Sequence, residues 1–559
     1  MPPEEWLYCT VKKIEEEFDN QLHIPKRDDG KPFTTTNLYP DQKQVVGKVM
    51  DKLLEWLTCD DLGNFKPLRM TINGAGGSGK SVVINTIVSL MRRMFGINDV
   101  VRVVAPTGTA AFNVNGETFH HLLGNTVTRR HYTPYTMSKE KRLKLVVKKF
   151  GTLLALIVDE RSLINSKDLG TVEQQISETI FGGGLMSDES FGGLPIVILV
   201  GDDYQLPGTE EGALVALEKK GGTKMTQRGR SALLECANLV MDLEGSKRMS
   251  DKKQKQKELV ARLRTGANIL DEDVEKLLSL HLNNSMEKRH PKTVIDAIKK
   301  DAIYLYYTNA KRIRKHHERL AEVSGPNNPV AMLRPQSTGP SGGKGISKHF
   351  ENEMAETSKI CIGAKVAIES RNFCPMFGLH GGARGTVDEI VFKKGENPNN
   401  GDLPLYVVVD FPLYCGPAWG TKNPTVSEQE VFLDGGNIGL PDFSPIVYLD
   451  SHILCSLCNQ HVPIPTSTYV CQRNGGCCTR TNLPLTLAYA RTIHKFQGQS
   501  ADPVDEGKIS NIYKGIICDQ DEDDAEGWAL GLLCIAVSQA ASTRKGSSNR
   551  CCWCASADS

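Results

Sequence analysis

The sequence predicts an α/β protein whose parallel strands are covered by helices on both faces. Runs of Val, Ile and Leu at 68–72, 100–104, 153–158 and 196–200 alternate with stretches of helical spacing. Runs that are apolar throughout are typical of strands buried on both faces. A glycine-rich segment follows the first run directly, and such sheets bind ligands at the carboxyl ends of their strands. We therefore expect a ligand site at that edge.

The remaining elements follow in chain order. Helices are expected at 40–60, from Lys80 to Phe95 and near 108–113. A new unit begins near 246 with a basic helical stretch, followed by a strand at 302–306 and a helix at 309–322. Residues 323–358 are rich in Gly, Pro, Ser and Asn and are interpreted as an exposed loop or linker. A β-like pattern over 360–450 predicts a small inserted barrel before the α/β pattern resumes at 485.

Composition limits the class of protein. A chain of 559 residues, 40% apolar and 24% charged, should hold two or more globular domains. Lys and Arg number 67 against 66 Asp and Glu, and a near-zero net charge neither supports nor excludes nucleic-acid binding. No apolar run approaches the length of a membrane span, and the N-terminus lacks a secretory core. We expect a soluble, intracellular protein with no membrane partner.

The glycine-rich segment GAGGSGKS has the pattern G-x-x-x-x-G-K-[ST] of a phosphate-binding loop. Its glycines allow backbone N–H groups to surround a polyphosphate, while Lys80 reaches the outer phosphates and Ser81 can ligate Mg²⁺. A structural glycine turn is the alternative, which the flanking strand and helix disfavour. The expected nucleotide-binding residues of this loop are Gly74, Ala75, Gly76, Gly77, Ser78, Gly79, Lys80 and Ser81.

Two later strands also end in polar residues. LLALIV is followed by Asp159 and Glu160; we expect Asp159 to hold Mg²⁺ and Glu160 to accept a proton from an attacking water. IVILVG is followed by Gln205, which could orient that water. An acidic pair more often caps a helix, and DDYQLP alone is an ordinary turn. The three strand ends together favour a catalytic site that contains Lys80.

A family resemblance joins these segments. GAGGSGKS, VVAPTGTAAFNVNGETFHHLLG, LIVDERSLI, VGDDYQLPG and LAYARTIHKFQGQS, in this order, resemble the PIF-type (petite integration frequency) DNA helicases of the RecD-like branch of helicase superfamily one. GAKVAIESRNFCPMFGLHGGARGTV also matches a segment of that family. The resemblance runs from about residue 38 to about residue 545. It implies two RecA-like P-loop NTPase domains, with a β-rich small-barrel insertion in the second.

We expect the following division of the chain: an N-terminal extension (1–36), a first RecA-like domain (37–245), the start of the second with a linker (246–358), the inserted module (359–482), the end of the second domain (483–545) and a tail (546–559).

The resemblance also implies binding roles. Gln42 in LYPDQ matches the adenine contact, although a glutamine at a helix start could simply face solvent. Arg248 matches an arginine that meets charge on the γ-phosphate, and the alternative is an ordinary exposed arginine. Gln497 and Gly498 match the nucleotide-facing side of the second domain. The positions that match DNA contacts are Thr107, Gly108, Thr118, His120, Thr492, His494 and Lys495. The basic run 139–149 could line the DNA path or form a solvated helix face.

The chain departs from the family where Gln539 stands in place of an expected arginine. A neutral amide cannot supply that charge, and Arg544 could replace it only if the chain bends differently. Asp203 also stands where the family more often has an aromatic or apolar residue. Cysteines at 455, 458, 471 and 477 could supply four thiolates to zinc, but free thiols are favoured. The four candidate ligands are Cys455, Cys458, Cys471 and Cys477.

The resemblance implies an ATP- and Mg²⁺-dependent helicase that moves 5′ to 3′ on single-stranded DNA and unwinds forked duplex. Roles in DNA repair, recombination or telomere maintenance, a nuclear or mitochondrial location and a monomeric state are expected on the same basis. Two alternatives stay open. One is a nucleotide-dependent DNA-binding protein whose hydrolysis is impaired by Gln539, and the other is a P-loop ATPase that acts on something other than DNA.

Overall fold

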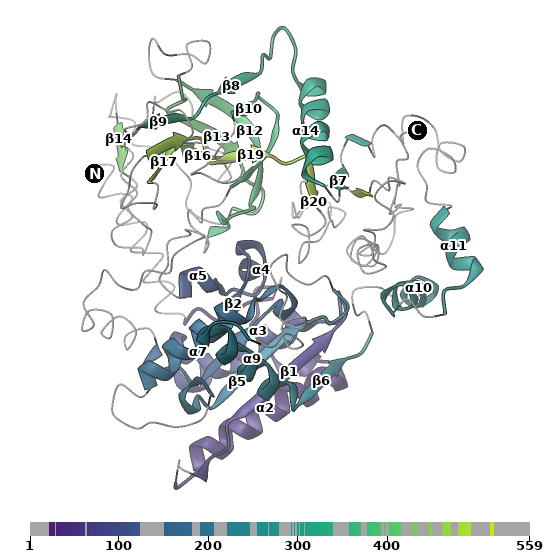
Figure 1. Cartoon of the computed structure of the whole chain (residues 1–559), viewed down its shortest axis with the longest axis vertical. Coiled ribbons are helices and arrows are strands. Elements are labelled where there is room, and N and C mark those ends of the chain that lie inside the picture. The colour runs from purple at the N-terminus through teal and green to yellow at the C-terminus, as the bar shows by residue number, and fades with distance from the viewer. Residues whose placement is uncertain are drawn as a thin grey trace.

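The computed structural model describes residues 22–122, 150–180, 190–205, 221–278, 299–338, 357–369, 377–392, 402–414, 461–470 and 479–492, with short gaps inside several ranges, and the strands at 429–432, 446–449 and 515–518. Figure 1 shows helices around a sheet that contains β1, β2, β5 and β6 in one half of the molecule, and a β-rich part in the other.

The first sheet has six parallel strands in the order β3-β2-β4-β5-β1-β6. All four apolar runs predicted to be strands lie in it. Their neighbours at the two edges, β3 and β6, were not predicted, because they are short and not continuously apolar. The strands are β1 (Leu68–Gly74), β2 (Val101–Ala105), β3 (Glu117–Thr118), β4 (Ala155–Val158), β5 (Ile196–Gly201) and β6 (Val240–Leu243).

Helices cover both faces of this sheet, which confirms the predicted fold class. Alternate residues of β5 point in opposite directions: Ile196 and Ile198 join one apolar cluster, and Val197 and Leu199 join another. The first cluster includes α2 (Pro40–Thr58) and α3 (Lys80–Phe95), and the second includes α7 (Ser166–Ile180) and α9 (Lys224–Ala237). The strand ends are thereby fixed between two packed layers.

Helices α7 and α9 touch through glycine. A Cβ atom added to Gly229 would lie 1.8 Å from the carbonyl oxygen of Ser166, and one added to Gly170 would lie 1.9 Å from that of Met225. Real Cβ atoms do not approach backbone oxygens this closely. The two helices therefore pack backbone to backbone at this point, and no larger residue fits there.

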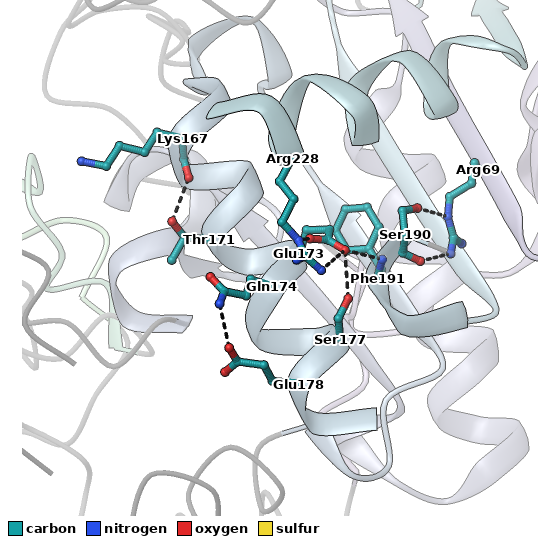
Figure 2. A network of polar contacts seen from close by, with 10 residues as sticks. All are labelled: Arg69, Lys167, Thr171, Glu173, Gln174, Ser177, Glu178, Ser190, Phe191 and Arg228. Carbon is teal, nitrogen blue, oxygen red and sulfur yellow. Dashed lines mark hydrogen bonds and ion pairs between the residues drawn. The ribbon is translucent and has the colours of Figure 1, made fainter. Parts of the chain in front are cut away.

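A buried carboxylate secures the same layer. Glu173 of α7 is 3% exposed, and it is ion-paired with Arg228 of α9. Its Oε1 atom also accepts hydrogen bonds from the Ser177 hydroxyl (2.9 Å) and from the backbone N–H of Phe191 (3.0 Å). Figure 2 shows these partners converging on Glu173, with Arg69 of β1 bound to Ser190 beside them. This charge is thus well satisfied by structural partners.

The second parallel sheet is formed from distant parts of the chain, in the order β20-β7-β21. Helix α14 (Asn309–Val323) follows β7 and packs against β7 and β20. The β-rich module lies in the sequence between α14 and β20, so it is an insertion into this domain, as predicted. The strands are β7 (Ala302–Tyr306), β20 (Ala490–Thr492) and β21 (Gly515–Cys518).

The inserted module has a five-stranded antiparallel sheet in the order β16-β13-β12-β11-β19 and three smaller pairings, β10-β8, β17-β18-β9 and β14-β15. The strands are β8 (Ala331–Leu333), β9 (Gln336–Thr338), β10 (Ser358–Ile360), β11 (Lys365–Ile368), β12 (Arg384–Val391), β13 (Tyr406–Asp410), β14 (Gln429–Phe432), β15 (Ile446–Leu449), β16 (His461–Pro465), β17 (Ser467–Val470), β18 (Thr479–Asn482) and β19 (Leu485–Leu487).

The structure corrects part of the expected linker. Residues 331–338 were interpreted as loop, yet they form β8 and β9, which pair with β10 and β18 of the module. Each strand has three residues, too few to show a period, and each is specified by a partner that is distant in sequence. The domain boundaries themselves stay predictions.

The described helices that complete the fold are α4 (Gly108–Asn113), α5 (Phe119–Leu122), α10 (Gln254–Thr265) and α11 (Asp271–Leu278). Across the described ranges, none of the helices has both the length and the apolar character of a bilayer span.

The glycine contact between α7 and α9 gives a stability prediction. Gly229→Ala should lower the free energy of unfolding of the first domain by about 2–3 kcal/mol, because the added methyl group overpacks the contact. Gly47→Ala in α2 is the matched control. Since nothing lies within 4 Å of a Cβ at Gly47, that change should stabilise the helix by roughly 0.5–1 kcal/mol. Urea unfolding monitored by circular dichroism measures both values, and equal effects would contradict the contact.

Candidate functional site

The glycine-rich loop forms a tight turn between β1 and α3. Gly77 and Gly79 adopt φ angles of 82° and 92°, in the left-handed region that favours glycine. A Cβ atom at Gly74 would lie 2.5 Å from the Ser78 hydroxyl oxygen. Lys80 then begins α3, and Ser81 is exposed in the first turn. The start of the helix therefore sits at the carboxyl edge of the sheet, as an anion-binding loop requires.

The Lys80 side chain folds back over this loop. Its ammonium group donates hydrogen bonds to the carbonyl oxygens of Gly74 (2.7 Å) and Ala75 (3.3 Å). Neutral carbonyls are weaker partners for an ammonium group than charged oxygens. A phosphate oxygen placed in the loop would therefore compete well for this lysine.

Gln42 is buried against the glycine loop. The alternative interpretation, that this glutamine simply faces solvent at the start of a helix, is therefore wrong. The side chain is 2% exposed, and its amide donates to the carbonyl oxygen of Ser78 (3.1 Å). Its Oε1 atom accepts a hydrogen bond from the Tyr39 backbone N–H (3.1 Å). A Cβ at Gly79 would lie 2.2 Å from the Gln42 amide nitrogen, which explains a glycine there. The adenine contact stays a prediction.

Asp159 and Glu160 follow β4, which is separated from β1 only by β5. They are 6% and 8% exposed, and neither Asp159 Oδ1 nor Glu160 Oε2 has a hydrogen-bond partner. Burial raises the pKa of Asp159, and burial together with the Asp159 charge raises the pKa of Glu160 to about 7. The nearby charge of Lys80 opposes both increases. Buried carboxylate oxygens without partners are a donor set that suits a hard cation such as Mg²⁺.

Gln205 lies at the same edge of the sheet. It closes a turn after β5, in which its backbone N–H donates to the carbonyl oxygen of Asp202 (3.1 Å). Because β5 lies between β4 and β1, the structure brings Gln205, the acidic pair and the glycine loop to three adjacent strand ends. This convergence is what the sequence predicted.

A polar chain links four strand ends beneath this site. Arg161, after β4, is ion-paired with Asp203, after β5. The Asp203 backbone N–H donates to Asn73 Oδ1 in β1 (3.1 Å), and Asn73 Nδ2 donates to Asp242 in β6 (2.8 Å). We call Arg161, Asp203, Asn73 and Asp242 the strand-end network. A Cβ at Gly201 would lie 2.6 Å from Arg161 Cγ, so glycine there leaves room for the arginine.

Sequence reasoning missed this network. Asp203 was recognised only as a departure from the family, and its partner Arg161 was not singled out. Opposite charges that follow two apolar strands were the available signal, but the pair depends on β4 and β5 being neighbours.

The segment after β6 is held against the glycine loop. The Lys247 backbone N–H donates to the carbonyl oxygen of Gly77 (2.7 Å), and its ammonium group lies 3.4 Å from Asp41 Oδ2 and 4.5 Å from the centre of the Tyr39 ring. Arg248 follows directly and lies outside the described residues.

The described residues that are expected to contact DNA lie at the start of α4 and in β3, α5 and β20. Thr107 caps α4 by accepting a hydrogen bond from the Ala110 N–H (3.2 Å), and Gly108 begins that helix. Thr118 accepts a hydrogen bond from the His121 N–H (3.3 Å). His120 lies in α5, and Thr492 ends β20, where it is buried.

A turn of the inserted module bridges α4 and β20. The His380 ring lies 5.0 Å from that of Phe112 in α4. Arg491 of β20 donates to the carbonyl oxygen of Gly382 (3.2 Å), and a Cβ on Gly382 would lie 3.0 Å from the Thr109 hydroxyl. The first and second domains therefore present their candidate contacts on elements that meet at this turn.

Several predicted residues lie outside the described part of the chain. They are Arg248, His494, Lys495, Gln497, Gly498, Gln539, Arg544 and the four cysteines for which zinc was the less favoured interpretation, Cys455, Cys458, Cys471 and Cys477. The run 139–149 also lies outside it. Among the described residues, no three His, Cys, Asp or Glu side chains cluster as metal ligands.

The Arg161–Asp203 pair can be tested by charge reversal. Arg161→Asp alone should lower the free energy of unfolding by about 2–4 kcal/mol, because it puts a carboxylate at a buried position beside the partly exposed Asp203. Combining it with Asp203→Arg should recover at least half of the loss. The exposed Lys52–Glu55 pair on α2 is the control, whose reversal should change stability by less than about 0.5 kcal/mol. Purely additive effects in the double variant would show that the two residues do not interact.

Comparisons with known proteins find similar sequences among the PIF1-like helicases. Residues 37–267 match the family model of the PIF1-like helicases. The chain is 23% identical over 485 residues to "ATP-dependent DNA helicase Pif1" of Psychrobacter sp. and 25% identical over 516 residues to "ATP-dependent DNA helicase PIF1" of Xenopus laevis, matches that cover 80% and 90% of this chain. In both cases it spans 63% of the relative's length.

Solved structures show the same fold. The crystal structure of Pif1 helicase from Candida albicans matches with a TM-score of 0.57 at 19% identity, over 90% of this chain and 92% of that one. A Bacteroides Pif1 helicase in complex with ADP-AlF3 and single-stranded DNA matches with a TM-score of 0.51 at 18% identity, over 89% of each chain. The chain thus has the fold of these Pif1 structures, and its residues 37–267 are similar to the PIF1-like helicase family.

Proposed function

We propose that this chain is an ATP-dependent DNA helicase that translocates on single-stranded DNA and unwinds duplex. The observation that carries the proposal is the placement of Lys80, after β1, near two buried acids after β4, each with one carboxylate oxygen that lacks a hydrogen-bond partner. The helicase names of the relatives support it, as does the nucleotide- and DNA-bound Bacteroides structure.

In this proposal the glycine loop and Lys80 bind the phosphates of ATP, and Gln42 recognises adenine. Ser81 and Asp159 would hold Mg²⁺, which offsets phosphate charge when it is bound. The orphaned Oδ1 atom of Asp159 fits that role. Gln497, Gly498 and Arg248 would complete the site from the second domain.

Glu160 would act as the general base. A carboxyl group whose pKa is raised to about 7 by burial and by Asp159 is well matched to proton transfer near neutral pH. Gln205 orients a water whose oxygen attacks the γ-phosphorus, while Glu160 takes its proton. The bond from phosphorus to the bridging oxygen breaks, and ADP and phosphate leave. Lys80 and Arg248 stabilise the charge on the transferred group.

DNA would cross both domains near the turn that joins α4 to β20. Thr107, Gly108, Thr118 and His120 would contact the strand from the first domain, and Thr492, His494 and Lys495 from the second. The two domains would close around ATP and reopen after hydrolysis. This cycle would move the positions at which they bind the DNA strand along that strand. Movement 5′ to 3′, action on forks, a monomeric state, a nuclear or mitochondrial location and roles in repair, recombination or telomere maintenance belong to the same proposal.

A second candidate is a nucleotide-dependent DNA-binding protein with impaired turnover. Gln539 favours it, because an arginine is expected at that position and contributes on the order of a thousandfold to rate in related enzymes.

DNA-stimulated ATP hydrolysis distinguishes the two candidates. The helicase proposal expects Lys80→Ala to reduce turnover by at least about a hundredfold, because the transition state loses its lysine. Lys43→Ala, at an exposed lysine of α2, should leave turnover unchanged. A wild type no faster than Lys80→Ala, with turnover restored by Gln539→Arg, would favour the binding protein. Strand displacement from a 5′ overhang but not from a 3′ overhang tests the direction with the same preparations.

A further inference from the structure

A separate pocket lies where α14 meets the inserted module, away from the strand ends of the first domain. Its volume is about 70 Å³. One water needs roughly 10–15 Å³ on this measure, so the pocket has room for a group of several heavy atoms. It is lined by α14 on one side and by β10 and β19 on the other, and Figure 1 shows α14 running beside the module.

His316 of α14 lines this pocket without a hydrogen-bond partner. The residue is 4% exposed, and neither ring nitrogen is satisfied. Burial, with the nearby charges of Arg312 and Arg491, lowers the pKa of His316 to about 3, so its ring is neutral at neutral pH. A neutral imidazole has one donor and one acceptor. Leaving both unused in the interior is unfavourable, which points to a polar occupant that bonds the ring nitrogen facing the pocket.

The surroundings favour an anion. Arg312, His317 and Lys359 line the pocket, and so do the hydroxyl-bearing residues Thr357, Ser358 and Thr486. No carboxylate is among the described residues that line it. Cationic groups with nearby hydroxyls are the usual surroundings of bound oxyanions.

We propose that this pocket binds a phosphate monoester or inorganic phosphate, at a site distinct from the glycine loop. An anionic phosphate oxygen can accept a hydrogen bond from the N–H of the His316 ring, and the cationic groups that line the pocket favour its charge. A phosphodiester carries a single negative charge, whereas a terminal or free phosphate carries about two at neutral pH and suits the cationic lining better. The ligand is therefore either free phosphate or the phosphorylated end of a nucleic-acid strand, and it would join α14 to the module.

The test uses the full chain carrying Lys80→Ala, so that the glycine loop contributes little binding. Inorganic phosphate should bind saturably at one site in calorimetric titration. His316→Leu should weaken that binding at least tenfold, and Lys359→Gln should weaken it severalfold. Arg314→Gln is the matched control, because Arg314 is exposed on α14 and does not line the pocket, and it should change affinity less than twofold. Unchanged thermal unfolding confirms that each variant is folded.

A 5′-phosphorylated dinucleotide and its unphosphorylated form identify the source of the phosphate. Competition by the phosphorylated form at lower concentration than inorganic phosphate identifies a strand end, and equal or weaker competition identifies free phosphate. The absence of saturable binding below about 10 mM would overturn the site. Binding that is unaffected by both His316→Leu and Lys359→Gln would also overturn it. Neither result depends on ATP hydrolysis, so the proposed function is tested separately.

Discussion

Two carboxylates held out of water beside one lysine govern the arrangement of the first domain's site. Burying a charge without a partner is costly, and the pKa values of Asp159 and Glu160 are raised accordingly. Glu173 is buried in the same domain, but Arg228, Ser177 and Phe191 satisfy it. The chain can thus satisfy a buried acid fully, yet after β4 it leaves one oxygen of Asp159 and one of Glu160 without a hydrogen-bond partner. Buried carboxylate oxygens without hydrogen-bond partners are typical of sites in which a bound ligand supplies the missing partners.

The sheet makes this arrangement possible. Apolar packing on both faces fixes the ends of β1, β4 and β5, and the strand-end network then ties those ends together and extends to β6. Beyond β6, Lys247 is bonded to Gly77 just before Arg248. The hydrogen bond between Gly77 and Lys247 therefore connects the glycine loop directly to the segment that leads to the second domain. On the other side, the contact of His380 with Phe112 links the first domain to the inserted module.

The sequence predicted what depends on local pattern. The runs before Gly74, Asp159 and Gly201 were recognised as strands because burial on both faces makes them apolar throughout, and the polar residues that follow them meet as expected. The three-residue strands β8 and β9 were not recognised, because their partners are remote in sequence. The Arg161–Asp203 pair was not predicted either, because it depends on the order of strands in the sheet. The burial of His316 among cations likewise depends on how α14 packs against the module, which helical spacing does not reveal.

The most direct test is the stability of the ligand-free protein with either of two buried acids neutralised. Glu160→Gln should raise the free energy of unfolding by about 1 kcal/mol, because it removes a buried charge that lacks a full set of partners. Glu173→Gln should lower it by about 3 kcal/mol, because Arg228 is left without its carboxylate. Urea unfolding of both variants beside the wild type provides the measurement. Similar losses of stability in both would mean that Glu160 is an ordinary structural acid, and the account of a site that a nucleotide completes would be wrong.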